Sequence, residues 1–154
     1  MSRDLDALIV PREVSAVKSW IKSGKALHTM RDHLLHQNCI VGCCWGMKLS
    51  KLERSMMASA FTMVSNTSIL YANQEAYGED QTFLRWYVWP WAVYNSISHD
   101  SYYCQDYPNT SPFPTERKIE MFNYVSAYPY EIGPYTAVCP KECRPKQHQD
   151  WEYC

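Results

Sequence analysis

The stretch PREVSAVKSWIKSGKALHTM, residues 11–30, decides the fold because it joins a complete helix signal to a strand signal. Pro11 suits the first turn of a helix, and apolar residues then recur on one helical face. Gly24 supplies a stop, so residues 11–23 are predicted to form a helix. The apolar and β-branched residues that follow predict a short strand over residues 26–30.

The rest of the chain continues this alternation of helix and strand patterns. Residues 39–44 are apolar and suit a buried strand or turn, whereas residues 49–64 carry apolar side chains at helical intervals without Gly or Pro. A third helix is predicted to begin near Glu79 or Asp80 and to end at Pro90, before a strand over residues 97–103. Alternating helices and strands indicate an α/β fold.

Composition allows one globular domain with a hydrophobic core, since 154 residues include 46% hydrophobic and 20% charged residues. The net charge is −1 and the basic residues are scattered, so neither nucleic acid nor an anionic membrane is an expected partner. The longest apolar run, residues 86–94, is too short to span a bilayer and contains Pro90. The opening residues do not resemble a signal peptide.

Seven cysteines suggest disulfides and an oxidising compartment, and the odd number leaves at least one cysteine free or paired elsewhere. Asn66-Thr67-Ser68 and Asn109-Thr110-Ser111 match the N-glycosylation pattern. Both features favour the secretory lumen or the extracellular space. Four cysteines lie late in the chain and suit a disulfide-tied tail: Cys104, Cys139, Cys143 and Cys154.

Zinc is the alternative use of these cysteines. Cys39, Cys43 and Cys44 form one candidate group, and the Cys139-x-x-x-Cys143 spacing with His148 forms another. Disulfides or buried thiols are preferred, because no second cysteine pair has the spacing of a zinc ribbon or finger.

Asp4-Leu5-Asp6 is the strongest chemical motif of the chain. Two carboxylates one residue apart can together present oxygen ligands to a hard divalent cation, which is a usual way to hold a metal-bound diphosphate. The structural alternative is an exposed acidic turn at the start of the chain.

The order of motifs over residues 2–125 resembles that of a poorly characterised family of glycosyltransferase-like domains. Its members contain an Asp-x-Asp motif within a single Rossmann-like domain that binds a nucleotide sugar. The motifs are Arg3-Asp4-x-Asp6, Pro11-Arg12-Glu13, His28-x-Met30-Arg31-Asp32-His33, Gly42-x-x-Trp45-Gly46, Tyr77-Gly78-x-Asp80-Gln81, His99-Asp100-Ser101-Tyr102-x-Cys104 and Phe113-Pro114-Thr115-x-Arg117.

This resemblance implies a fold and a domain division. The family places Asp-x-Asp about halfway through its domain, so a motif at residue 4 implies only the acceptor-side, C-terminal half of that fold. Residues 1–127 would form this partial nucleotide-diphospho-sugar-transferase-like unit. One expectation is that this unit is truncated or inactive as a glycosyltransferase. Residues 128–154 would form an irregular tail rich in Cys and Pro.

The resemblance also implies a metal site and a catalytic pair. Asp4 and Asp6 would bind Mn²⁺ or Mg²⁺, with His99 as a third ligand. Asp80 and Gln81 would lie beside the transferred sugar and the acceptor, with Asp80 as general base or sugar-binding carboxylate. Alternatively, Asp80 is an ordinary charge at a helix start and His99 is hydrogen-bonded inside the fold.

Substrate contacts are expected from two further segments. Arg31 would clamp a diphosphate and Asp32 would orient His33, although the first two also fit paired structural charges. Trp45 and Gly46, in a tight loop, would stack on an acceptor sugar, although Trp45 also fits a core anchor. The partners would then be a nucleotide-sugar donor and a glycan acceptor.

The competing function is a non-catalytic, disulfide-containing module that binds carbohydrate or has a structural role. It predicts no metal dependence and no response to loss of Asp4 or Asp6. A zinc hydrolase ranks below both, because no His-Glu-x-x-His helix occurs.

Overall fold

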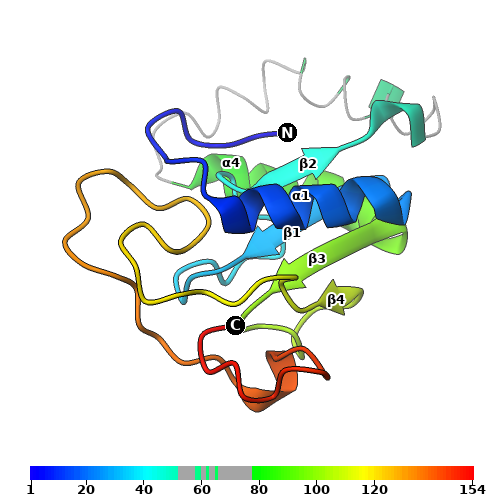
Figure 1. Cartoon of the computed structure of the whole chain (residues 1–154). Helices are drawn as coiled ribbons and strands as arrows, with labels where there is room; N and C mark the ends of the chain where they lie inside the picture. Colours follow the sequence, from blue (N-terminus) through cyan, green and yellow to red (C-terminus); the bar gives the residue numbers. More distant parts are fainter. Residues whose placement is uncertain (52–57, 60–61, 63–64, 66–77) are drawn as a thin grey trace.

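The computed structural model describes residues 1–51, 58–59, 62, 65 and 78–154. These residues contain both helices and strands (Figure 1). In chain order the elements are α1 (Pro11–Ser23), β1 (Leu27–Arg31), β2 (Trp45–Met47), the 3₁₀ turn η1 (Leu49–Lys51), α4 (Glu79–Phe83), the π-helical turn η2 (Leu84–Val88), α5 (Trp89–Ala92), the 3₁₀ turn η3 (Val93–Asn95), β3 (Ser96–Asp100), β4 (Thr110–Ser111) and the 3₁₀ turn η4 (Lys141–Cys143).

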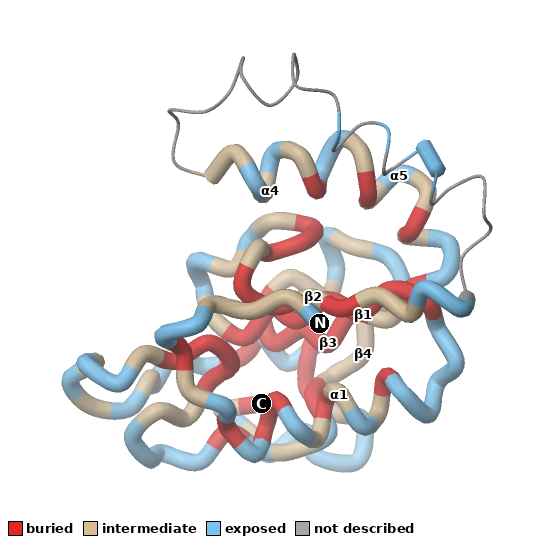
Figure 2. Tube along the Cα trace, turned by 90° about the horizontal axis from the view of Figure 1, so that it is seen from above, coloured by how far each residue is buried: buried red, intermediate tan, exposed pale blue. Residues whose placement is uncertain are grey.

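Within the described residues, four strands form one mixed sheet in the order β2-β1-β3-β4. β1, β3 and β4 run parallel, and β2 is an antiparallel edge strand. Figures 1 and 2 show that α1 covers one face of this sheet and the helical segment from α4 to α5 covers the other. The prediction of an α/β fold is therefore confirmed at the level of a mixed α/β architecture.

The opening helix and strand form as predicted. α1 spans Pro11–Ser23, and Gly24 follows it in the left-handed conformation at φ 71°. β1 spans Leu27–Arg31, one residue later than predicted, and every residue in it is buried. Side chains alternate across the sheet, so Met30 joins the core beneath α1 and Leu27 joins the core beneath α4 and α5.

The third helix begins at Glu79, but the prediction that Pro90 ends it is wrong. Helical structure continues through Pro90 to Ala92 because the preceding turn is widened into a π-helix. In that turn Trp89 donates its main-chain N–H to the carbonyl of Leu84, five residues earlier. The wider turn relieves the clash that a proline ring makes in a regular α-helix.

Two other predictions are corrected. β3 ends at Asp100 rather than residue 103, because the Asp100 carboxylate accepts hydrogen bonds from the main-chain N–H groups of Tyr102 and Tyr103 and turns the chain. Trp45 and Gly46 lie in edge strand β2 rather than in a tight loop. A Cβ on Gly46 would lie 2.9 Å from two ring atoms of Trp20, so glycine lets α1 pack closely on β2.

The tail is held by disulfides. Cys104 pairs with Cys143 and Cys139 pairs with Cys154, as a disulfide-tied tail requires. Within residues 128–154 the only regular element is η4. Of the seven cysteines, Cys39 is free and buried, and the remaining two, adjacent in sequence, pair with each other.

Some predicted features fall largely beyond the described residues. The predicted helix over 49–64 begins with the 3₁₀ turn η1, and most of its remainder lies outside them, as does the Asn66 acceptor sequence. Asn109 is exposed. No helix in the part of the chain that the structure describes is long and apolar enough to cross a membrane.

Candidate functional site

A pocket of about 630 Å³ lies where the N-terminal segment, the loop after β1, the start of α4 and residues 124–131 meet. This volume is within the range of small-molecule sites. Its lining combines carboxylates, imidazoles, tyrosines and a few apolar groups: Asp4, His33, Leu35, His36, Val41, Gly42, Cys43, Gly78, Asp80, Gln81, Tyr124, Ser126, Tyr128 and Glu131.

Four of the predicted site residues line this pocket: Asp4, His33, Asp80 and Gln81. They come from three segments far apart in the sequence. Gly42 makes their approach possible, since a Cβ on it would lie 2.1 Å from Oδ2 of Asp80. The main chain of the loop after β1, at Gly42, therefore packs directly against the carboxylate of Asp80 in the first turn of α4.

Two tyrosines engage carboxylates at the pocket wall. Tyr128 donates its hydroxyl to Oδ2 of Asp4 at 2.9 Å, and Tyr124 donates to Glu131. Burial, followed by the hydrogen bond to Asp4, raises the pKa of Tyr128 to about 12. Burial and the Glu131 carboxylate also raise the pKa of Tyr124. Both phenols stay protonated at neutral pH and can donate hydrogen bonds.

The pocket histidines are neutral at physiological pH. Burial lowers the pKa of His33, and burial with the nearby His33 charge lowers the pKa of His36 to about 4. Nδ1 of His33 accepts the main-chain N–H of Leu35 at 3.1 Å. A neutral imidazole can accept a proton from a ligand or coordinate a metal ion.

The lining is acidic. Three carboxylates, Asp4, Asp80 and Glu131, reach it, whereas no lysine or arginine is among the described residues that line it. Such a pocket repels a free diphosphate and favours ligands that are neutral, cationic or bound to a metal cation.

Arg31, predicted to clamp a diphosphate, is instead fully buried on the sheet. Its Nε donates to Oδ2 of Asp100 at 2.5 Å, and its Nη1 donates to the carbonyl of Cys39 at 2.7 Å. The guanidinium also lies 4.2 Å from the ring centroid of Tyr107. Arg31 therefore joins β1 to β3 and does not line the pocket, because its charge is neutralised within the core.

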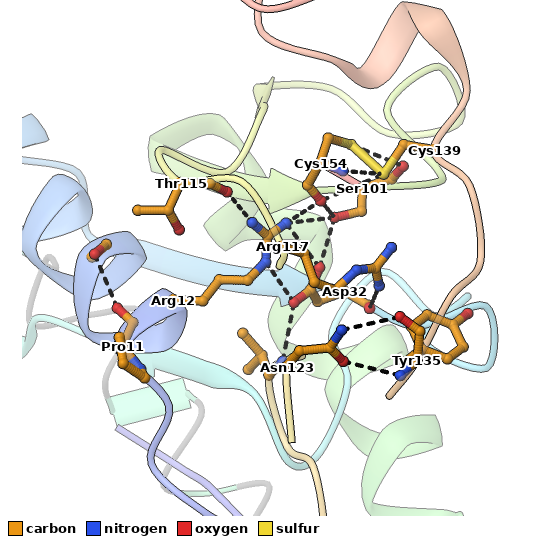
Figure 3. A network of polar contacts seen from close by, with 12 residues as sticks. Pro11, Arg12, Asp32, Ser101, Thr115, Arg117, Asn123, Tyr135, Cys139 and Cys154 are labelled. Carbon is orange, nitrogen blue, oxygen red and sulfur yellow. Dashed lines mark hydrogen bonds and ion pairs between the residues drawn. A yellow bond between two sulfur atoms is a disulfide. The ribbon is translucent and has the colours of Figure 1, made fainter. Parts of the chain in front are cut away.

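Asp32 has both carboxylate oxygens occupied by the fold (Figure 3). Oδ2 accepts from Nε of Arg12 at 2.8 Å and from the main-chain N–H of Val125 at 3.0 Å. Oδ1 accepts from Arg12 at 3.0 Å and from the Ser101 hydroxyl at 2.7 Å. Asp32 thus links α1, β1 and two later loops, rather than orienting His33 as predicted.

The predicted metal ligands do not gather at one point. Asp4 reaches the pocket, and Asp6 is exposed and does not line it. His99 is buried in β3, where its Nδ1 lies 2.7 Å from Nε2 of His28. Across the described part of the chain, the one group of three His, Cys, Asp or Glu residues close enough for a metal ion is His36, Cys43 and Cys44.

Trp45 and Gly46, predicted to contact the acceptor, lie outside the pocket lining. Trp45 packs against the core beneath α4 and α5, and Gly46 lies under the Trp20 ring. The structural alternative for Trp45, a core anchor, describes this position.

One side of the pocket was not predicted from the sequence: Tyr124, Ser126, Tyr128 and Glu131. They lie in an irregular segment with no periodicity, and two of them belong to the predicted tail. Their only local signal was a high density of tyrosines, which core packing also produces. Comparison of the chain with protein-family models, curated proteins and solved structures finds no match.

Proposed function

We propose that this pocket binds a sugar and that the chain transfers a glycosyl group from a nucleotide-sugar donor to a glycan or another acceptor. One observation carries the proposal: Asp4, His33, Asp80 and Gln81, expected from motif order to handle a sugar donor, line one pocket. Sequence neighbours would share a pocket trivially, but residues 4, 33 and 80 are not neighbours.

The lining has the chemistry of a sugar site. Carboxylates accept hydrogen bonds from sugar hydroxyls, and the phenol oxygens of Tyr124 and Tyr128, whose O–H groups donate to Glu131 and Asp4, can also accept from them. Asp80 is exposed at the pocket and is the residue proposed to act as general base on the acceptor hydroxyl. The side-chain oxygen of Gln81 accepts a hydrogen bond from Asn38, which holds Gln81 beside Asp80.

A neighbouring depression suits the acceptor. It has a volume of about 300 Å³ and shares Gly78 and Gln81 with the main pocket. Trp86 lines it and is 64% exposed, so its ring is available to a sugar face.

The donor's charge determines the metal requirement. The predicted set of Asp4, Asp6 and His99 does not fit one ion, because only Asp4 reaches the pocket. Asp4 with the donor's own phosphates remains a reasonable arrangement for Mn²⁺ or Mg²⁺, which often bind through one or two carboxylates and substrate oxygens. Such an ion would neutralise the diphosphate.

Calorimetric titration of the whole chain with sugar nucleotides and with neutral sugars, with and without Mn²⁺, tests the proposal. We expect sugar nucleotides to bind only with Mn²⁺, and we expect Asp4→Asn to abolish this Mn²⁺-dependent binding. Asp80→Asn should abolish transfer, measured as release of nucleoside diphosphate in the presence of acceptor. The matched controls are Asp6→Asn and Asp106→Asn, two exposed carboxylates outside the pocket.

The second candidate is a non-catalytic carbohydrate-binding module. It is favoured by the buried ion pair of Arg31, which leaves the described pocket lining without a fixed cation for a diphosphate. Neutral sugars that bind without metal, together with no response to sugar nucleotides under any condition, would replace glycosyl transfer with this function.

A further inference from the structure

A His-Cys-Cys cluster forms part of the pocket wall. Cys43 and Cys44 are adjacent in sequence and are joined by a disulfide. Nε2 of His36 lies 4.0 Å from Sγ of Cys43, and the ligand atoms of all three residues lie within 4.8 Å of one another. Cys43 lines the pocket, whereas Cys44 is fully buried.

The imidazole of His36 is available as a ligand. Its Nδ1 is buried and has no hydrogen-bond partner in the fold, so no protein contact fixes which ring nitrogen carries the proton. An imidazole nitrogen without a partner in the fold can coordinate a metal ion.

We propose that reduction of the Cys43–Cys44 disulfide creates a binding site for Zn²⁺, with His36, Cys43 and Cys44 as ligands and the open coordination position facing the pocket. A dithiol reductant supplies two electrons and two protons, and its own disulfide is the product. The cleaved disulfide becomes two thiols. When Zn²⁺ binds, each thiol releases its proton and the two sulfurs coordinate as thiolates.

The ligand types and their geometry select this ion. Thiolate and imidazole ligands favour Zn²⁺ over Mn²⁺ or Mg²⁺, which prefer oxygen. In a tetrahedral zinc site the nitrogen and sulfur ligands are separated by roughly 3.5 Å, from Zn–S and Zn–N bonds of about 2.3 Å and 2.0 Å. The 4.0 Å between Nε2 of His36 and Sγ of Cys43 is close to that separation, and reduction of the disulfide lets the two sulfurs move apart to separate coordination positions.

The acidic pocket provides a favourable field for a cation. Asp80 lies against Gly42, the residue before Cys43, and the described lining residues include neither lysine nor arginine. A bound ion would keep a position open to a water or ligand in the pocket, as catalytic rather than structural zinc sites do. The proposal does not depend on glycosyl transfer, since the metal can be detected without any sugar.

The test is anaerobic titration of the full chain with Co²⁺, a spectroscopic substitute for Zn²⁺. The protein is reduced with a dithiol, desalted and titrated while thiolate-to-cobalt charge-transfer absorption is recorded. One equivalent should bind to the reduced protein, Zn²⁺ should displace it, and the oxidised protein should give no such absorption. Loss of His36 in His36→Ala should weaken binding by at least about tenfold, since even losing an outer-shell partner costs that much.

Reduction also frees the tail cysteines, so two paired variants assign the site. Cys43→Ser with Cys44→Ser should lose the absorption, whereas Cys104→Ser with Cys143→Ser should keep it. The proposal is overturned if the reduced wild type gives no thiolate absorption, or if the first double variant gives the wild-type signal. If that variant does not fold, unchanged cobalt affinity in His36→Ala refutes the assignment alone.

Discussion

The buried pair His28 and His99 predicts that acidification from pH 7 to pH 5 destabilises the fold. Burial, then the charges of His99 and Lys48, lowers the pKa of His28 from 6.5 to about 2. Burial, then the Arg12 charge, lowers the pKa of His99 from 6.5 to about 4. Trp20 stacks on His28 at 5.2 Å between ring centroids, and both histidines are buried, so a second proton would be poorly solvated.

The sign follows from which state binds protons first. Folded-state pKa values below 6.5 mean that the unfolded chain takes up protons first as the pH falls. The stability of the neutral pair is therefore full above pH 6.5 and is lost below it. Between pH 7 and pH 5 each histidine costs about 2 kcal/mol of unfolding free energy, or about 4 kcal/mol for both.

Urea unfolding monitored by circular dichroism at pH 7, 6 and 5, with disulfides intact, measures this loss. A loss of about 4 kcal/mol should lower the urea midpoint by roughly 2 M. The double variant His28→Asn, His99→Asn should lose about 4 kcal/mol of the pH dependence and keep the part due to His33 and His36, whereas His148→Asn, exposed in the tail, should keep all of it. The reasoning is refuted if the double variant and the wild type lose the same free energy over this range.

Two further substitutions test the packing of α1. Asp32→Asn should lower the free energy of unfolding by about 3 kcal/mol, because it leaves the Arg12 guanidinium buried without its counter-charge. Urea unfolding measures this loss, and an effect equal to that of the exposed Asp106→Asn would contradict the prediction. Gly46→Ala should cost about 1–3 kcal/mol, because the new Cβ would lie 2.9 Å from the Trp20 ring. A melting temperature unchanged from wild type would show that the ring can move aside.

Local patterns predicted the elements that depend on neighbouring residues. Pro11 and Gly24 mark the ends of α1 within the chain itself, so its bounds were predictable. The prediction that Pro90 ends the third helix was wrong because the widened turn before it depends on how Leu84 and Val88 pack under the sheet. Sequence periodicity does not encode such a change of helical turn.

The candidate site divides in the same way. Residue type and the resemblance in motif order singled out Asp4, His33, Asp80 and Gln81, and the pocket contains all four. Residue type cannot say where an arginine or histidine points. Arg31 and His99 are also of types that can bind a ligand, but each faces a buried partner across the β1–β3 pair.

The sequence by itself determined the α/β alternation, the opening helix and strand, and the presence of a cysteine-tied tail, because each depends on residue type and short-range spacing. Only the tertiary structure decided which charged groups are available to a ligand. Burying a charge requires a partner from another segment, and parallel strand pairing brought Asp100 to Arg31 from 69 residues away. The same long-range folding brought Tyr128 and Glu131 to the pocket and Cys43 to His36.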